Sequence, residues 1–272
     1  MDSYDKVLLA RDAARPNLRY YISRLFNDFF EQKGDRGCRD DQAIVGGIAL
    51  LEDRPVTVLG HQKGATLEEN VACNFGMPGP EGYRKALRLM EQAEKFGRPI
   101  VTFVDTPGAY PGKEAEERGQ GEAIAQCLLR MGELRVPTLT VVIGEGGSGG
   151  ALAISVADRI WMLENAVYSV LSPEGFATIL WKDAARAREA SELMKLTAQD
   201  LLEAGICDRV IPEPPGGLKQ GDERFFTGLR RLLNQEVESL CRMNTNGRLN
   251  ARYDRYRTIG AGGKGKAGER RE

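Results

Sequence analysis

Hydrophobic positions recur along the chain at two spacings, and these predict helices alternating with strands. Between residues 17 and 32, apolar and aromatic side chains fall three or four positions apart, which is typical of an amphipathic helix ending near Gly34. Short apolar runs at 43–51 and 55–60 instead predict strands, joined by a turn-like Glu52-Asp53-Arg54. The same reasoning predicts further strands at 99–104, 137–143, 159–163, 167–171 and 207–211, and helices at about 82–95, 115–132, 149 onward, 183–193, 198–203 and 222–242.

Strands and helices that alternate through short loops predict a mostly parallel sheet covered by helices. Local signals agree: Ser172-Pro173-Glu174 is typical of a helix start, and Thr197 with Asp200 is typical of a capping box. We therefore predict one α/β domain over residues 1–242. The remainder, residues 243–272, is rich in Gly, Lys and Arg, and we predict a disordered tail there.

Composition and charge exclude several classes of protein. The formal net charge of −1 gives no electrostatic reason to expect a nucleic-acid partner. No apolar run is long enough for a membrane span, and the first residues lack the basic segment and apolar core of a secretory signal. The five cysteines are scattered and never form a CxxC pair, which argues against disulfides and a structural zinc site. A cytoplasmic location is the simplest expectation.

His61 is the only histidine in the chain. Metal sites built from several histidines, such as HExxH, are therefore excluded, and any histidine-based proton relay would have to use this one ring. Its default interpretation is an ordinary residue at a strand end. We predict no metal site.

Two glycine-containing loops follow predicted strands, where α/β sheets usually place ligands. The first is DTPGAYPG at 105–112, which could also be a plain turn; the second is GEGGSGGA at 144–151, which leads into a helix. Consecutive glycines let backbone N–H groups approach a ligand closely, and N–H groups at a helix start lack intrahelical partners. The second loop could thus bind an oxyanion without a side chain.

Three short patterns offer other interpretations. Gly146-x-Ser148-x-Gly150 matches a hydrolase nucleophile elbow, but no histidine follows the serine. Gly144-x-Gly146-x-x-Gly149 matches a dinucleotide-binding fingerprint, although several strands precede it, whereas the fingerprint normally follows the first strand. Gly260 to Lys266 resembles part of a P-loop, but Ala267 replaces its Ser or Thr.

Seven motifs in order resemble one family. They are GHQKG at 60–64, NFGMPGPEGYRKALRLM at 74–90, DTPGAYPG at 105–112, AEERGQ at 115–120, GEGGSGGALA at 144–153, YSVLSPE at 168–174 and IPEPPGG at 211–217. Together they resemble the alpha subunits of the multi-subunit acetyl-coenzyme A carboxylase carboxyltransferase, over roughly residues 5–240.

The resemblance implies a crotonase-like (ClpP/crotonase) α/β fold, a superhelix of ββα units. It implies a transferase that moves a carboxyl group from carboxybiotin, on the biotin carboxyl carrier protein, to acetyl-CoA. The product is malonyl-CoA, in the first committed step of fatty acid biosynthesis, and the whole complex with biotin carboxylase is ATP-dependent. A separate beta subunit, in an α2β2 heterotetramer, would bind acetyl-CoA and carry a zinc ribbon, leaving no metal in this chain.

The resemblance also implies roles for particular residues. Backbone N–H groups of Gly149, Gly150 and Ala151 would stabilise negative charge on the ureido oxygen of biotin. Substrate-binding positions would be Gly108, Ala109, Tyr110, Lys113 and Arg118, although residues 116–118 could equally be a solvated helix face. Rival classes that use the same sequence features are a single-chain enoyl-CoA hydratase or isomerase, a dinucleotide-dependent oxidoreductase and a non-enzymatic scaffold.

Overall fold

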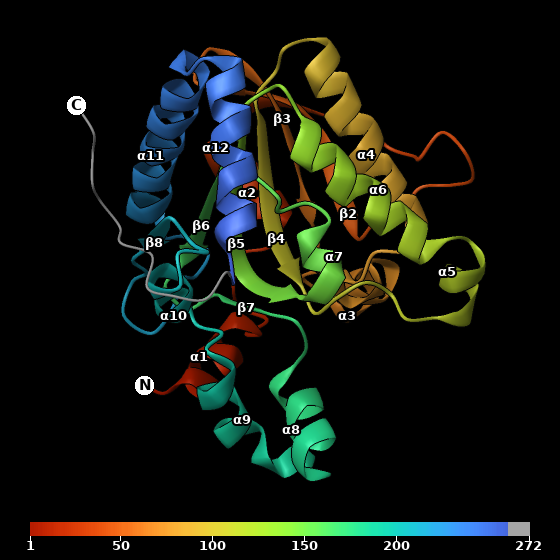
Figure 1. Cartoon of the computed structure of the whole chain (residues 1–272), viewed down its shortest axis with the longest axis vertical. Helices are drawn as coiled ribbons and strands as arrows, with labels where there is room; N and C mark the ends of the chain where they lie inside the picture. Colours follow the sequence, from red (N-terminus) through yellow and green to blue (C-terminus); the bar gives the residue numbers. More distant parts are fainter. Residues whose placement is uncertain (261–272) are drawn as a thin grey trace.

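An eight-stranded sheet forms the centre of the computed structural model, which describes residues 1–260 (Figure 1). The strand order is β1-β2-β3-β4-β5-β6-β8, and β7 pairs separately with β5. The strands β1, β2 and β3 pair antiparallel, and all later pairs are parallel. The strands are β1 Asn27–Glu31, β2 Ile44–Leu51, β3 Arg54–His61, β4 Ile100–Thr106, β5 Thr138–Gly147, β6 Arg159–Leu163, β7 Val167–Ser169 and β8 Arg209–Ile211.

Helices cover both faces of this sheet. A Cβ atom added to Gly46 would meet Leu89 of α4, whereas one added to Gly60 would meet Leu18 of α2. Gly46 pairs with Leu59, the neighbour of Gly60, and successive strand residues point to opposite faces, so α4 and α2 lie on opposite sides. The helices are α1 Ser3–Ala10, α2 Leu18–Leu25, α3 Leu67–Ala72, η1 Asn74–Gly76, α4 Pro80–Lys95, α5 Lys113–Glu117, α6 Gln120–Glu133, α7 Ser148–Leu152, α8 Pro173–Trp181, η2 Ala184–Arg186, α9 Ala187–Met194, α10 Ala198–Glu203, α11 Glu223–Arg242 and α12 Thr245–Thr258.

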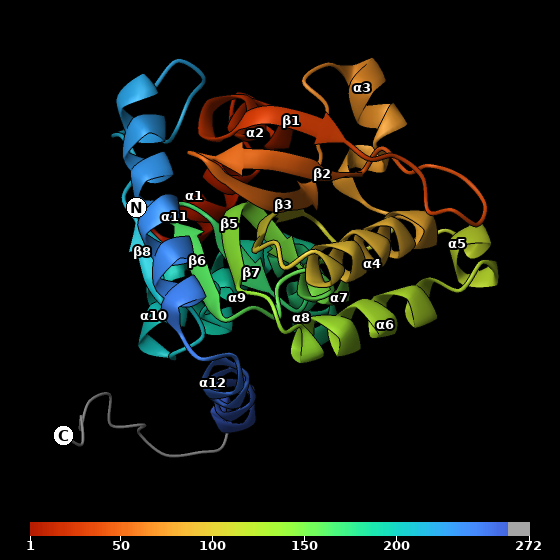
Figure 2. The ribbon, with the colours of Figure 1, turned by 90° about the horizontal axis from the view of Figure 1, so that it is seen from above.

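Figure 2 shows α4 and α6 side by side on one flank and α11 along the opposite side, with α12 projecting beyond the end of α11. Below the sheet in Figure 1, α1, α8 and α9 form a small layer of their own. Its apolar contacts centre on Val7, Val167 and Leu196. No helix within residues 1–260 is long and apolar enough to cross a membrane.

Most predicted elements are confirmed, including the proline start of α8 at Ser172 and the capping box of α10 at Thr197. The predicted helix at 17–32 is wrong beyond Leu25, because Asn27–Glu31 forms the edge strand β1. The carbonyl oxygen of Phe30 lies where a side chain on Gly47 would stand, so β1 approaches β2 closely. The predicted helix at 115–132 is interrupted at Gly119, whose φ of +84° starts a new helix.

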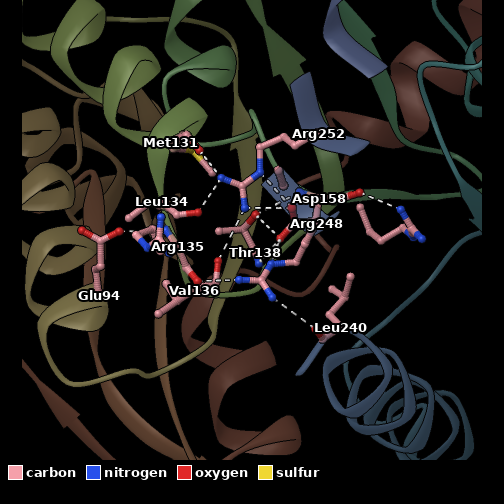
Figure 3. A network of polar contacts seen from close by, with 12 residues as sticks. Glu94, Met131, Leu134, Arg135, Val136, Thr138, Asp158, Leu240, Arg248 and Arg252 are labelled. Atoms are coloured by element: carbon pink, nitrogen blue, oxygen red, sulfur yellow. Dashed lines mark hydrogen bonds and ion pairs between the residues drawn. The ribbon is translucent and has the colours of Figure 1, made fainter. Parts of the chain in front are cut away.

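Helix α12 corrects the prediction of a disordered tail from residue 243. Arg252 is buried and donates to the carbonyl oxygens of Met131 (2.7 Å) and Leu134 (2.9 Å) at the end of α6 (Figure 3). Its Nε also donates to Asp158 at 2.8 Å, and Arg248 lies on the other side of that carboxylate. These bonds satisfy carbonyls that a helix end leaves unpaired. Residues 261–272, including most of the P-loop-like pattern, lie outside the described part of the chain.

Candidate functional site

The two glycine loops lie together at the carboxyl ends of β4 and β5. The strands run parallel, with Thr106 opposite Gly146, so the segments that follow them meet at one edge of the sheet. A Cβ atom on Gly147 would lie 2.1 Å from the carbonyl oxygen of Pro107, and one on Gly150 would lie 2.5 Å from the backbone nitrogen of Ala109. These two positions require glycine because the backbones of the loops are in direct contact.

Other glycines of the second loop face protein rather than a ligand. A Cβ atom on Gly144 would meet the carboxylate of Asp105 at 2.4 Å, and one on Gly146 would meet the ring of Tyr168 at 2.1 Å. Both residues belong to β5 and are buried. Two of the three fingerprint glycines are therefore used for internal packing, which disfavours the dinucleotide interpretation.

The open side of the loop lies at the start of α7. Ser148 is exposed and adopts the left-handed backbone conformation (φ +55°), while a Cβ atom on Gly149 would contact only Ile124, at 3.7 Å. A cavity of about 370 Å³ opens here. It is lined by Ser148, Gly149, Leu152, Ser155, Ile160, Tyr168, Ser169, Val170, Leu201, Ile206, Tyr256 and Ile259. Helix α12 thus contributes to the wall beside Gly149.

A chain of charges holds the loops from the α1 side. Lys63 Nζ lies 2.7 Å from Asp105 and 3.1 Å from Glu145, and Arg11 Nε lies 2.6 Å from Glu145. Burial opposes the charge on Lys63, but the two carboxylates outweigh it and raise the pKa of the lysine. The charges therefore tie together the end of β4, the end of β5 and α1.

Sequence reasoning assigned no role to this chain of charges, although Lys63 lies in the GHQKG motif and Asp105 and Glu145 open the two loops. It also assigned none to Tyr83. His61 and Tyr83 are fully buried, the hydroxyl of Tyr83 lies beneath Gly150, and the backbone of Gly150 is close enough to His61 to affect its pKa. His61 lies in the GHQKG motif and Tyr83 in the motif at 74–90, but only the structure shows that the two residues come close together.

The predicted substrate-binding residues fall into two groups. Gly108 and Ala109 contact the second loop through Gly147 and Gly150. Tyr110 and Arg118 line a different cavity, of about 250 Å³, where Arg118 Nε donates to the buried Glu81 at 2.7 Å.

Lys113, predicted with these residues, is the first residue of α5 and directly follows the first loop. Its side chain is 88% exposed and pairs with Glu117. Among the described residues, no group of His, Cys, Asp and Glu side chains could hold a metal ion.

Sequence comparisons connect this arrangement with known proteins. A family model described as acetyl co-enzyme A carboxylase carboxyltransferase-like matches residues 1–260. The acetyl-coenzyme A carboxylase carboxyl transferase subunit alpha of Clostridium botulinum (strain Eklund 17B / Type B) is 56% identical over 94% of each chain. A protein of Natranaerobius thermophilus, named as the subunits beta/alpha of the same enzyme, is 55% identical over 94% of this chain and 42% of its own length.

Solved structures share the fold at low sequence identity. Transcarboxylase 12S superimposes with a TM-score of 0.69 at 21% identity, over 86% of this chain and 43% of that chain. A Pseudomonas malonate decarboxylase hetero-tetramer superimposes with a TM-score of 0.69 at 16% identity, over 88% of this chain and 94% of that chain. The present chain spans less than half of the transcarboxylase chain. These matches confirm the predicted crotonase-like α/β fold.

Proposed function

The chain belongs to the acetyl co-enzyme A carboxylase carboxyltransferase-like family, and from this premise we propose that it is the alpha half of a biotin-dependent carboxyltransferase. With a separate beta subunit it transfers the carboxyl group of carboxybiotin to acetyl-CoA, giving malonyl-CoA. The observation that carries the proposal is the direct contact of the two loops, where a Cβ atom on Gly150 would lie 2.5 Å from Ala109. Relatives named as alpha subunits are 56% identical over nearly the whole chain.

The proposed chemistry depends on backbone donors. Gly149, Gly150 and Ala151 lie in the first turn of α7, and the N–H groups of Gly149 and Gly150 come too early in the helix to have an intrahelical acceptor. Such donors stabilise an oxyanion without changing their own protonation state. Carboxybiotin, on its carrier protein, supplies the carboxyl group and a ureido oxygen on which negative charge develops. We assign these three N–H groups to that oxygen.

The contacts of the first loop support its proposed role in binding. Gly108 adopts φ +147°, and the hydroxyl of Thr106 accepts from its N–H at 3.0 Å, so the turn is fixed beside Gly147. We assign Gly108, Ala109 and Tyr110 to the wall of the biotin site. Arg118 lines the second cavity together with Tyr110, and we assign it, with the exposed Lys113, to the approach to this site.

The proposal includes partners. Fusion of beta and alpha subunits in one relative supports a beta subunit that acts beside this chain. We assign acetyl-CoA binding to that subunit, in an α2β2 assembly, and delivery of carboxybiotin to the biotin carboxyl carrier protein after its carboxylation by biotin carboxylase. A cytoplasmic location fits these partners.

The test measures decarboxylation of malonyl-CoA with free biotin as the acceptor. The purified chain alone is expected to be inactive, and the same chain mixed with its beta subunit is expected to be active. Strong turnover by the rigorously purified single chain would contradict the proposal and favour a single-chain enzyme. Reduction of a nicotinamide dinucleotide by the chain would instead favour the oxidoreductase alternative.

A further inference from the structure

Two buried polar side chains meet beneath Gly150 without a hydrogen-bond partner. His61 ends β3 and Tyr83 lies in α4, and both side chains are fully buried. Within residues 1–260, neither ring nitrogen of His61 nor the hydroxyl of Tyr83 makes a hydrogen bond. Buried polar groups are nearly always paired, so two exceptions at one point need an explanation.

Both side chains are directed at the same peptide segment. A Cβ atom on Gly150 would lie 2.8 Å from Tyr83 Oη. The backbone of Gly150 is also close enough to His61 to affect the pKa of its ring. They therefore contact the glycine loop in the protein interior, whereas Gly149 borders the cavity.

The carbonyl group of Gly150 lacks its regular helical donor. In an α-helix the N–H of Ile154 would donate to Gly150, four residues earlier. Here it donates to Ala151 instead, at 3.3 Å, because α7 ends at Leu152. The carbonyl of Gly150 and the N–H of Ala151 belong to one peptide group, so a donor to the first polarises the second.

We propose that His61 and Tyr83 are positioning residues that hydrogen-bond to the Gly150 segment from beneath during turnover. They thereby orient the N–H donors of Gly150 and Ala151 and polarise the peptide group that carries the Ala151 N–H. This inference rests on the proposed carboxyltransferase function. Neither side chain touches the reacting atoms; each acts through the backbone.

The protonation states suit this role. Burial lowers the pKa of His61 to about 3, aided by the charge of Lys63, although the backbone of Gly150 and Phe103 favours the protonated ring. The neutral ring offers one donor and one acceptor. Burial raises the pKa of Tyr83 well above its ordinary value, so its hydroxyl stays a donor. Both groups therefore keep a fixed charge state while charge develops on the other side of the peptide.

Tyr83→Phe in the complex with the beta subunit tests the proposal most cleanly, because it removes one oxygen atom and keeps the ring. We expect kcat to fall about five- to tenfold, since support from behind the donors matters less than the donors themselves, whose loss costs about 10²–10³. KM for malonyl-CoA should be unchanged, and the melting temperature should not fall. A residue that only fills space would give unchanged kcat.

Tyr21→Phe is the matched control. Tyr21 is equally buried and its hydroxyl is also unpaired, but its ring packs against Phe103 and Phe226 and none of its atoms is among those nearest to Gly150. We expect wild-type kcat for this variant. Tyr83→Phe with kcat within twofold of wild type, or an equal loss in both variants, would overturn the proposal.

A second pair of variants tests His61. His61→Gln keeps a side-chain N–H donor, whereas His61→Leu removes it, so we expect a higher kcat for Gln than for Leu. Equal kcat in the two folded complexes would overturn the role of His61, and if His61→Leu fails to fold, Tyr83→Phe decides. An inactive wild-type complex would instead contradict the proposed function itself.

Discussion

The glycine loop at 144–151 and the docked helix α12 hold backbone groups in place by opposite means. In the loop, Gly147 and Gly150 let two backbones touch because they carry no side chain. At α12, Arg252 sends a long side chain into the interior, where it donates to carbonyl groups at the end of α6. The first arrangement leaves backbone N–H groups available to a ligand, and the second leaves the carbonyl groups it reaches satisfied.

This difference separates a site built for binding from one built for stability. The loop can lose its function through one added methyl group, with the fold still present. The α12 contact should do the reverse, because a buried charge without its partner destabilises the folded state. The comparison can therefore be tested by asking which variants lose activity and which lose stability.

Arg252→Ala should have the largest effect on stability. The guanidinium is buried and lies 2.8 Å from the buried carboxylate of Asp158. Its removal leaves that charge with fewer partners and should lower the free energy of unfolding by about 3–5 kcal/mol. Denaturant unfolding of the chain measures this. Arg257→Ala, an exposed position on the same helix, should cost under about 0.5 kcal/mol. A loss of under 1 kcal/mol for Arg252→Ala would show that the contacts of α12 do not stabilise the fold.

Lys63→Met should have an intermediate effect, because it removes the cation between Asp105 and Glu145. We expect a loss of about 1–3 kcal/mol in unfolding free energy. Activity per folded complex should fall as well, because these carboxylates open the two loops. Lys33→Met, at an exposed position, is the control and should be nearly neutral. If activity per folded complex is unaffected by Lys63→Met, the ion pairs of Lys63 stabilise the fold but do not contribute to the function of the loops.

His61 should make stability fall in mild acid. Its pKa of about 3 in the folded chain is below the ordinary 6.5, so the unfolded chain binds the extra proton first as pH decreases. Between pH 7 and 5.5 this one residue should remove about 1 kcal/mol of unfolding free energy. His61→Gln should abolish that part of the pH dependence. Identical pH dependence in the two proteins would show that His61 is not buried as a neutral ring.

Ser148→Ala should have the smallest effect. Ser148 matches the serine of a nucleophile elbow and has a left-handed backbone, but we assign its hydroxyl no chemical role. We expect activity within about threefold of wild type, which corresponds to under 1 kcal/mol. Steady-state decarboxylation by the complex checks this. Complete loss of activity in a folded complex would favour a serine nucleophile.

The same two regions show what the sequence could predict. The loop could be predicted because glycine runs that follow apolar strands are typical of close backbone approach. The strands of the sheet could be predicted because short apolar runs are typical of buried strands. Helix α12 was not, because a segment with many Arg and Asn residues has the composition of a solvated tail. Only the tertiary structure shows that Arg248 and Arg252 are buried.

Two other features also depended on tertiary contacts. The segment that forms β1 has aromatic residues at helical spacing, so a helix was predicted there. It forms a strand because it pairs with β2, which the local pattern does not show. Lys63 meets Glu145, 82 positions later in the chain, and Tyr83 meets Gly150. Local patterns carry no information about pairs so far apart, although each residue lies in or near a recognisable motif.

Gly150→Val is the strictest test of whether the glycine loop supplies backbone donors. A β-branched side chain at this position would meet the backbone of Ala109 and the hydroxyl of Tyr83, and would therefore displace the N–H donors of the loop. The measurement is decarboxylation activity per folded complex with the beta subunit, with folding followed by circular dichroism and assembly by sizing. Gly121→Val, where an added Cβ finds open space on α6, is the matched control. We predict that Gly150→Val assembles but loses at least about 100-fold in activity, while Gly121→Val stays near wild type. Near-normal turnover by Gly150→Val, or a loss of activity only in proportion to lost folding, would contradict the account.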